Sequence, residues 1–205
     1  MIKGIDVSKC QGKIDWAKVA ASGVQFAIIK AGGSNTTKPY TDKNFLANVI
    51  GAATNNIHIG AYYFVGKKCT SAKEGQANAL RFYDIIKNVV LDYPIYIDFE
   101  APDRKTKQGN TEACIAFCEQ MEALGYYVGI YASDISGFKE RLDISRLIAY
   151  DKWVARYGSE PKYAKGNIWQ YSSKGKVEGI RGNVDMDYSN IDFAKLIREK
   201  HLNGF

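Results

Sequence analysis

Two carboxylates close an apolar run in the middle of the chain, in the segment Tyr93-Pro-Ile-Tyr-Ile-Asp-Phe-Glu100. Successive side chains of a strand point to opposite faces, so Asp98 and Glu100 would share one face with Cβ atoms about 6–7 Å apart. Each negative charge raises the pKa of the other group, so one carboxyl can stay protonated near neutral pH. The pair is suited to general acid catalysis; the alternative is a strand end with two solvated carboxylates.

Two other segments carry carboxylates with the same alternation. In Gly4-Ile-Asp-Val-Ser8, Asp6 lies on the face opposite the apolar residues. In Val184-Asp-Met-Asp-Tyr188, Asp185 and Asp187 share one face. Unpaired carboxylates buried together are costly, so an acidic cleft explains these residues better than packing does. For Asp6 alone, a helix cap or a turn is the competing explanation.

Aromatic and amide side chains stand near the ends of the other apolar segments. Tyrosine and tryptophan combine a flat apolar face with a hydrogen-bonding group, which suits the C–H faces and hydroxyl groups of sugar rings. Tyrosine is abundant, with 14 residues, although core packing is the competing explanation for any single aromatic. We expect substrate contacts from Tyr62, Phe64, Tyr131, Trp153, Tyr157, Gln170 and Asp187.

These residues need a scaffold that gathers several strand ends, and the pattern of the chain predicts one. Strand-like and helical segments alternate up to Tyr131, and the regularity then weakens. Strands are predicted over 2–7, 25–31, 58–64, 94–100, 126–131, 152–157, 167–171 and 183–187. Helices are predicted over 16–21, 42–55, 71–90, 111–124 and 191–200, and turns over 158–166 and 172–182. The inner face of the helix over 71–90 is predicted to contain Ala79, Tyr83, Ile86 and Val90.

Repeated β–α units predict parallel strands joined by right-handed crossovers. We therefore predict an α/β fold, a flattened and irregular (β/α) TIM-like barrel of about eight strands whose last strands are partly antiparallel. Barrel enzymes place their chemistry at the carboxyl ends of the strands, where the acidic residues fall. A doubly wound open sheet is disfavoured because no Gly-x-Gly-x-x-Gly follows the first strand.

Composition limits the function classes. The chain has 205 residues, 46% hydrophobic and 24% charged, which fits one globular domain. Its histidines are His58 and His201, so a His-rich metal site is excluded, and we expect no metal or organic cofactor. The net charge of +6 is scattered, which fits a solvated surface or an anionic partner such as a cell wall, and no nucleic-acid fingerprint is present.

The four cysteines do not form a metal-binding pattern. None of Cys10, Cys69, Cys114 and Cys118 belongs to a Cys-x-x-Cys pair, so a zinc ribbon is not supported. Cys114 and Cys118 fall on one apolar face of a predicted helix, and we expect both to be reduced thiols in the core.

Seven short segments, taken in order, resemble the glycoside hydrolase family 25 muramidases, the lysozymes of bacterial, phage and fungal origin. The resemblance covers residues 4 to about 193. The segments are Gly4-Ile-Asp-Val-Ser8 with Gln11-Gly12 and Ile14-Asp-Trp16, Phe26-Ala-Ile-Ile-Lys-Ala31, Gly60-Ala-Tyr-Tyr-Phe64, Pro94-Ile-Tyr-Ile-Asp-Phe-Glu100, Gly129-Ile-Tyr-Ala-Ser133, Trp153-Val-Ala-Arg-Tyr157, and Trp169-Gln-Tyr-Ser172 leading to Gly182-Asn-Val-Asp185.

The resemblance implies a flattened barrel and hydrolysis of the β-1,4 bond between N-acetylmuramic acid and N-acetylglucosamine in peptidoglycan. It implies that Asp98 and Glu100 are the catalytic Asp-x-Glu, and that Asp6 and Asp185 are the other two site aspartates. Glu100 would be the general acid, and Asp98 would orient the acetamido group of the substrate, with inversion through a bound water as the alternative. The chain departs from the family pattern at Cys10, Tyr63 and Asp187, where an aromatic residue, His and Asn are common.

We expect residues 1–205 to be a single catalytic domain of the endolysin or autolysin type, with a family-like core over about 4–193 and no wall-binding module. The expected partner is the peptidoglycan glycan strand, with no nucleic-acid or membrane partner, and the chain is expected to be a monomer. No apolar run could span a membrane and no signal peptide opens the sequence. The expected route to the wall is therefore cytoplasmic accumulation followed by release through a holin or lysis, or prior removal of a signal.

Two alternatives stay open. A non-catalytic module that binds cell-wall glycan would keep the aromatic residues but would not require the acidic ones. A chitinase-like glycosidase with the pattern Asp-x-x-Asp-x-Asp-x-Glu, aligned on Glu100, would need aspartates in place of Tyr93 and Tyr96.

Overall fold

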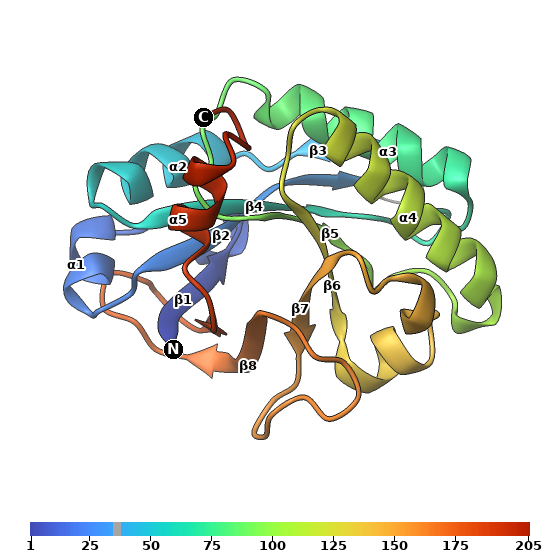
Figure 1. Ribbon diagram of the computed structural model, residues 1–205. Helices are drawn as coiled ribbons and strands as arrows, with labels where there is room; N and C mark the ends of the chain where they lie inside the picture. Colours follow the sequence, from blue (N-terminus) through green and yellow to red (C-terminus); the bar gives the residue numbers. More distant parts are fainter. Residues whose placement is uncertain (35–37) are drawn as a thin grey trace.

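A computed structural model of the chain describes residues 1–34 and 38–205. In this part of the chain, eight strands close into a barrel, with β1 pairing with both β2 and β9 (Figure 1). The barrel strands are β1 (Ile2–Val7), β2 (Phe26–Ser34), β4 (His58–Phe64), β5 (Ile95–Asp98), β6 (Val128–Ser133), β7 (Asp151–Ala155), β8 (Ile168–Gly175) and β9 (Val184–Ser189). A short strand, β3 (Pro39–Thr41), adds to the end of β2.

The last strand breaks the parallel order. β1, β2 and β4 to β8 run parallel to one another, whereas β9 runs antiparallel to both β8 and β1. The predicted barrel with partly antiparallel final strands is confirmed. The carboxyl ends of seven strands and the amino end of β9 therefore meet at one mouth.

Helices cover the first half of the barrel more fully than the second. The α-helices are α1 (Trp16–Ala21), α2 (Phe45–Thr54), α3 (Ala72–Ile86), α4 (Lys107–Ala123) and α5 (Phe193–Glu199). α3 and α4 lie side by side on the outside of the barrel (Figure 1). After β6 the connections contain only the π-helical turn η3 (Asp134–Lys139) and the 3-10 turn η4 (Ile144–Arg146) among the described residues, as the weakening of the pattern predicts.

Short polar side chains fix the starts of α1 and α3. Ser71 Oγ accepts the backbone N–H of Glu74 at the start of α3, and Asp15 Oδ1 accepts that of Lys18 at the start of α1. Each of these bonds satisfies a backbone donor that the first helical turn leaves unpaired. Gly125 follows α4 with a φ of 85°, a conformation that glycine adopts without strain.

Two hydrophobic clusters lie on the two sides of the barrel wall. The outer cluster, between wall and helices, includes Ile95, Ile97 and Phe99 of the segment that ends β5. The inner cluster includes Tyr96 and Trp153 and is closed at the bottom by α5. The predicted alternation is confirmed: apolar residues face outward to the helices, and the residues that share a face with Asp98 face inward.

Several boundaries differ from the predictions. α3 ends at Ile86, and its buried face contains Ala79, Phe82 and Ile86 in place of the predicted Tyr83 and Val90. The chain turns after Ile86, so Leu91 enters the core and Val90 stays 54% exposed. β5 ends at Asp98, two residues before the predicted end, and β8 continues to Gly175 through a segment predicted as a turn.

All four cysteines are free; Cys114 and Cys118 are buried on α4, as predicted. Within the described ranges, no helix is long and apolar enough to cross a membrane.

Candidate active site

A pocket of about 230 Å³ opens at the barrel mouth, and every barrel strand contributes to it directly or through the residues that follow it. Ligand pockets commonly have volumes of about 300–1,000 Å³, so this one has room for a small group only. Its walls are formed by Asp6, Lys30, Tyr62, Asp98, Glu100, Tyr131, Trp153, Tyr157, Gln170 and Asp185.

The structure brings together most of the residues singled out in the sequence. All four candidate catalytic acids line the pocket, as do five of the seven candidate contact residues. Phe64 and Asp187 do not line it. Phe64 lies beneath the Lys30 ammonium, whose Nζ is 4.9 Å from the centre of its ring. Asp187 is fully buried because β9 runs antiparallel, which places residue 187 one inward-facing position deeper than Asp185.

Lys30 is a pocket residue that the sequence analysis missed. Its Nζ lies 5.4 Å from the centre of the Tyr62 ring, within the range of a cation–π contact. Its charge opposes the rise in the pKa of Asp98. The sequence feature that could have identified Lys30 is its position as the single charged residue in the otherwise apolar run Phe26-Ala-Ile-Ile-Lys-Ala31.

Asp98 and Glu100 occupy different environments. The Asp98 side chain is buried at 4% exposure, and its Oδ1 meets no hydrogen-bond partner among the described residues. Burial, and then the charge of Glu100, raise the pKa of Asp98 well above its usual range. Glu100 is exposed at the rim. The pocket therefore offers an unpartnered oxygen at depth and an accessible carboxyl at its edge.

Asp6 is held by a chain of hydrogen bonds. Gln170 Nε2 donates to Asp6 Oδ2 at 2.7 Å. The hydroxyls of Tyr131 and Tyr157 donate to Gln170 Oε1 at 3.0 and 3.2 Å, which fixes the orientation of the amide. Burial and the charges of Asp187 and then Asp185 raise the pKa of Asp6, while the Gln170 bond opposes that rise.

Asp185 completes the acidic cluster from β9. Burial and the charge of Glu100 raise its pKa above the usual value. Although these carboxylates converge, no group of three or more His, Cys, Asp or Glu side chains in residues 1–34 and 38–205 could hold a metal ion.

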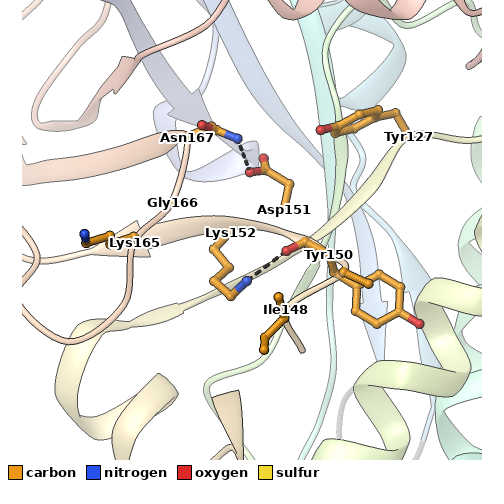
Figure 2. A pocket seen from close by; sticks show the side chains of 9 residues that line it. Tyr127, Ile148, Tyr150, Asp151, Lys152, Lys165, Gly166 and Asn167 are labelled. Atoms are coloured by element: carbon orange, nitrogen blue, oxygen red, sulfur yellow. Dashed lines mark hydrogen bonds between the residues drawn. The ribbon is translucent and has the colours of Figure 1, made fainter. Parts of the chain in front are cut away.

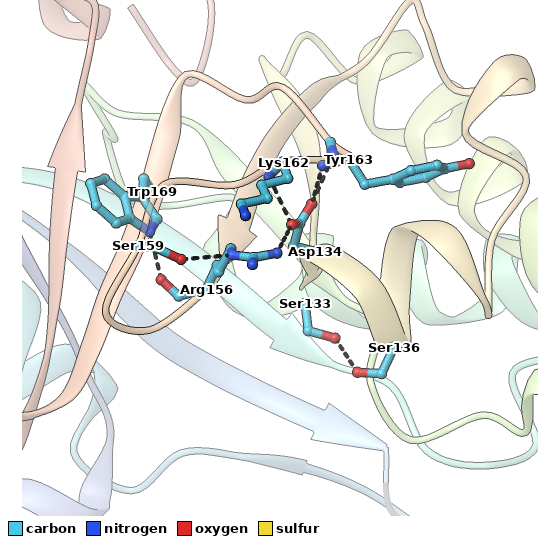
Figure 3. Close-up of polar contacts among 9 residues, drawn as sticks. Ser133, Asp134, Ser136, Arg156, Ser159, Lys162, Tyr163 and Trp169 are labelled. Atoms are coloured by element: carbon cyan, nitrogen blue, oxygen red, sulfur yellow. Dashed lines mark hydrogen bonds and ion pairs between the residues drawn. The ribbon is translucent and has the colours of Figure 1, made fainter.

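A buried aspartate anchors the loop beside the pocket (Figure 3). The Asp134 carboxylate accepts the backbone N–H groups of Lys162, Tyr163 and Ala164 at 2.8–3.0 Å. Arg156 Nη1 donates to the same carboxylate at 2.7 Å. Burial alone would raise the pKa of Asp134, but these hydrogen bonds lower it below the usual value. The anchored loop begins directly after Tyr157, so Asp134 positions one wall of the pocket.

A second pocket, of about 320 Å³, lies at the opposite end of the barrel, where β7 and β8 begin (Figure 2). Its central carboxylate, Asp151, accepts hydrogen bonds from Asn167 Nδ2 and from the Tyr96 hydroxyl, both at 2.8 Å. Lys152 Nζ donates to the backbone carbonyls of Leu147 and Tyr150. These polar groups form their hydrogen bonds within the protein, so they stabilise this end of the barrel.

A β/α barrel whose mouth combines paired carboxylates with aromatic walls is the arrangement of a glycoside hydrolase. The sequence model of the family described as "Glycosyl hydrolases family 25" matches residues 5–180. The chain belongs to this family.

Individual relatives agree with this membership. The chain is 29% identical to the autolytic lysozyme of Clostridium acetobutylicum over 188 residues, which are 91% of this chain and 55% of that protein. It is 28% identical to the CTP1L endolysin, with a TM-score of 0.83 over 97% of this chain and 70% of that one. It is also 28% identical to the bacterial lysozyme from Streptomyces coelicolor, with a TM-score of 0.77 over 96% and 95% of the two chains. The chain thus spans about half the length of the autolytic lysozyme.

Proposed function

We propose that the chain hydrolyses the β-1,4 bond between N-acetylmuramic acid and N-acetylglucosamine in peptidoglycan, as a lysozyme of the bacterial cell wall. The observation that carries the proposal is the pair at the end of β5, with a buried, unpartnered Asp98 oxygen below an exposed Glu100. Membership of family 25 and similarity to proteins named as lysozymes and as an endolysin support it.

In this proposal Glu100 is the general acid. It donates its proton to the glycosidic oxygen as the bond from that oxygen to the anomeric carbon breaks. Asp98 Oδ1 accepts the N–H of the 2-acetamido group, and the carbonyl oxygen of that group attacks the anomeric carbon. Water then opens the cyclic intermediate, with Glu100 taking its proton, and the product retains its configuration.

The remaining pocket residues have supporting roles. Asp6 and Asp185 place negative charge beside the positively charged transition state. Tyr62, Tyr131 and Tyr157 offer ring faces to the sugars. Trp153, which is 1% exposed and packs against Tyr62 and Tyr131, supports these walls from behind together with Phe64, Gln170 and Asp187. We propose that the barrel acts on the wall as a monomeric catalytic unit without a metal or organic cofactor.

The stereochemistry of the product separates the two possible routes. The proposed route predicts that NMR, recorded before mutarotation, detects the β anomer of the new reducing sugar. Direct appearance of the α anomer would establish inversion through a bound water. Retention accompanied by a glycosyl ester on Asp98 would instead make Asp98 a nucleophile and overturn the acetamido route.

Clearing of purified Gram-positive cell walls distinguishes an enzyme from a glycan-binding module. The wild-type chain should lower the turbidity of the suspension, with and without EDTA, while Glu100→Gln should bind the walls without clearing them. Glu119→Gln, an exposed change on α4, is the matched control and should clear like the wild type. Binding of the wild type without clearing would show a non-catalytic module, and clearing that EDTA abolishes and a divalent ion restores would show a metal requirement.

A further inference from the structure

Lys30 is the one basic side chain among the described residues that line the pocket. It points into the barrel from β2, since Phe26 and Ile28 at alternate positions of the same strand belong to the inner cluster. Four carboxyl groups line the same pocket, yet Lys30 forms no ion pair with any carboxylate of residues 1–34 and 38–205. Its ammonium is therefore available to a ligand.

Two aromatic rings hold this ammonium near Asp98. Lys30 pairs with Tyr62 in the register of β2 and β4, but its Nζ lies closer to the ring centre of Phe64, at 4.9 Å, than to that of Tyr62, at 5.4 Å. Phe64 pairs with Asp98 in the register of β4 and β5. The lysine side chain thus extends toward the mouth along the two rings, and its charged end reaches the level of Asp98.

The two sugars of peptidoglycan differ at the carbon beside the acetamido group. N-acetylmuramic acid carries a lactyl ether at C3, whereas N-acetylglucosamine carries a hydroxyl there. The lactyl arm ends in a carboxylate, or in an amide carbonyl where a peptide stem is attached. An ammonium group is a donor without acceptor capacity, and its hydrogen bonds to such oxygens are stronger than bonds between neutral groups.

We propose that Lys30 binds the lactyl arm of N-acetylmuramic acid and so makes the site select this sugar over N-acetylglucosamine, a role that rests on the proposed function. When Asp98 holds the acetamido group at C2, the arm on the adjacent carbon C3 lies beside Asp98, where the Lys30 ammonium is held. Lys30 Nζ then donates to a lactyl oxygen, while Tyr62 and Phe64 keep the ammonium in place.

The competing role for Lys30 is to balance the charge of the acids. Its charge opposes the rise that burial and Glu100 cause in the pKa of Asp98. The two roles differ in one measurable respect. A lysine that only balances charge affects the binding of both sugars alike, whereas a lysine that binds the lactyl arm affects only glycans that carry this arm.

Binding to the inactive Glu100→Gln chain separates the two roles. Titration calorimetry compares a peptide-free tetrasaccharide of alternating N-acetylmuramic acid and N-acetylglucosamine with a tetramer of N-acetylglucosamine. Added to this chain, Lys30→Met should weaken binding of the muramic tetrasaccharide about 10-fold to 100-fold, as expected for the loss of a charge-assisted hydrogen bond, and that of the other tetramer less than about threefold. Retained binding of the second tetramer also shows that the variant is folded.

Two further variants control for the loss of charge. Lys30→Arg keeps a cationic donor and should retain the preference for the muramic tetrasaccharide. Lys174→Met removes the same charge from an exposed position of β8 that does not line the pocket, and it should bind both tetramers like the parent chain.

Equal losses for the two tetramers would assign Lys30 to charge balance and overturn the proposed selection. A parent chain without a preference, or a preference that survives Lys30→Met, would overturn it as well. The proposed function fails separately. A wild-type chain that shows the Lys30-dependent preference but cleaves no glycan keeps the sugar selection and loses the hydrolysis, whereas cleavage of walls without the preference does the opposite.

Discussion

At the scale of single residues, two acids that are neighbours in sequence acquire different properties because the strand ends between them. β5 ends at Asp98, Phe99 turns into the outer core, and Glu100 stands at the rim of the pocket. A buried carboxyl with a free oxygen is suited to hold a polar group of a ligand. An exposed carboxyl can exchange its proton with solvent between turnovers, as a general acid must.

Replacement of Glu100 tests the role of the acid. Glu100→Gln keeps the shape of the side chain but removes its transferable proton, so the rate of glycan hydrolysis should fall about 10²-fold to 10⁴-fold. The measurement is the initial rate of reducing-end release from soluble peptidoglycan fragments. A variant that keeps more than a tenth of the wild-type rate would show that another group supplies the proton.

Asp187 should reveal its protonation through stability. Its raised pKa means that the folded state holds a proton that the unfolded chain loses above about pH 4, so its contribution to stability falls as pH rises. Asp187→Asn has no such dependence and should have a higher melting temperature than the wild type at neutral pH. The difference in melting temperature between variant and wild type should shrink as pH falls from 7 toward 4, and calorimetry measures it. A difference that is constant over this pH range, or of opposite sign, would contradict the prediction.

At the scale of elements, the strands and the inward positions of their residues were predictable from alternation alone. Asp6, Asp98 and Asp185 follow from the period of two, which β1, β5 and β9 obey, whereas β2 and β8 contain register shifts. The loops were not predictable, because a long-range contact such as that of Asp134 with the backbone of residues 162–164 leaves no periodic signal. The depth of Asp187 was missed because alternation puts Asp185 and Asp187 on the same inward face and does not show which of the two lies nearer the mouth.

The Asp134 anchor gives a testable property of the loop. Hydrogen bonds from the backbone and from Arg156 lower the pKa of Asp134, although burial opposes this. The ionised Asp134 therefore stabilises the folded protein above the ordinary carboxyl pKa, and this contribution is lost as pH falls. Asp134→Asn should therefore destabilise the protein at neutral pH, with a deficit that narrows under acidic conditions. Loosening of the loop that follows Tyr157 should also raise KM more than it lowers kcat.

Denaturant unfolding at several pH values and steady-state kinetics check both parts of this prediction. Asp103→Asn is a suitable control, because Asp103 is exposed and caps only the short 3-10 turn over Arg104–Thr106. A deficit for Asp134→Asn that is independent of pH would show that the ionised carboxylate is not the anchor.

At the scale of the whole molecule, the net charge affects binding to the cell wall more than it affects the catalytic step. The net charge of +6 should attract anionic wall polymers, and this attraction weakens as added salt shortens the Debye length from about 10 Å at 0.1 M to about 3 Å at 1 M. Sedimentation of the inactive Glu100→Gln chain with purified walls should show weaker binding at high salt. Binding that salt leaves unchanged would assign the affinity to the glycan contacts alone.

The identity of the sugar at the new reducing end tests the central claim most directly. Purified peptidoglycan is digested to completion, reduced with borohydride, and its fragments are identified by mass spectrometry. The account predicts that every new reducing end is N-acetylmuramic acid, with no new peptide amines. New ends that are N-acetylglucosamine, or release of peptide amines alone, would contradict it.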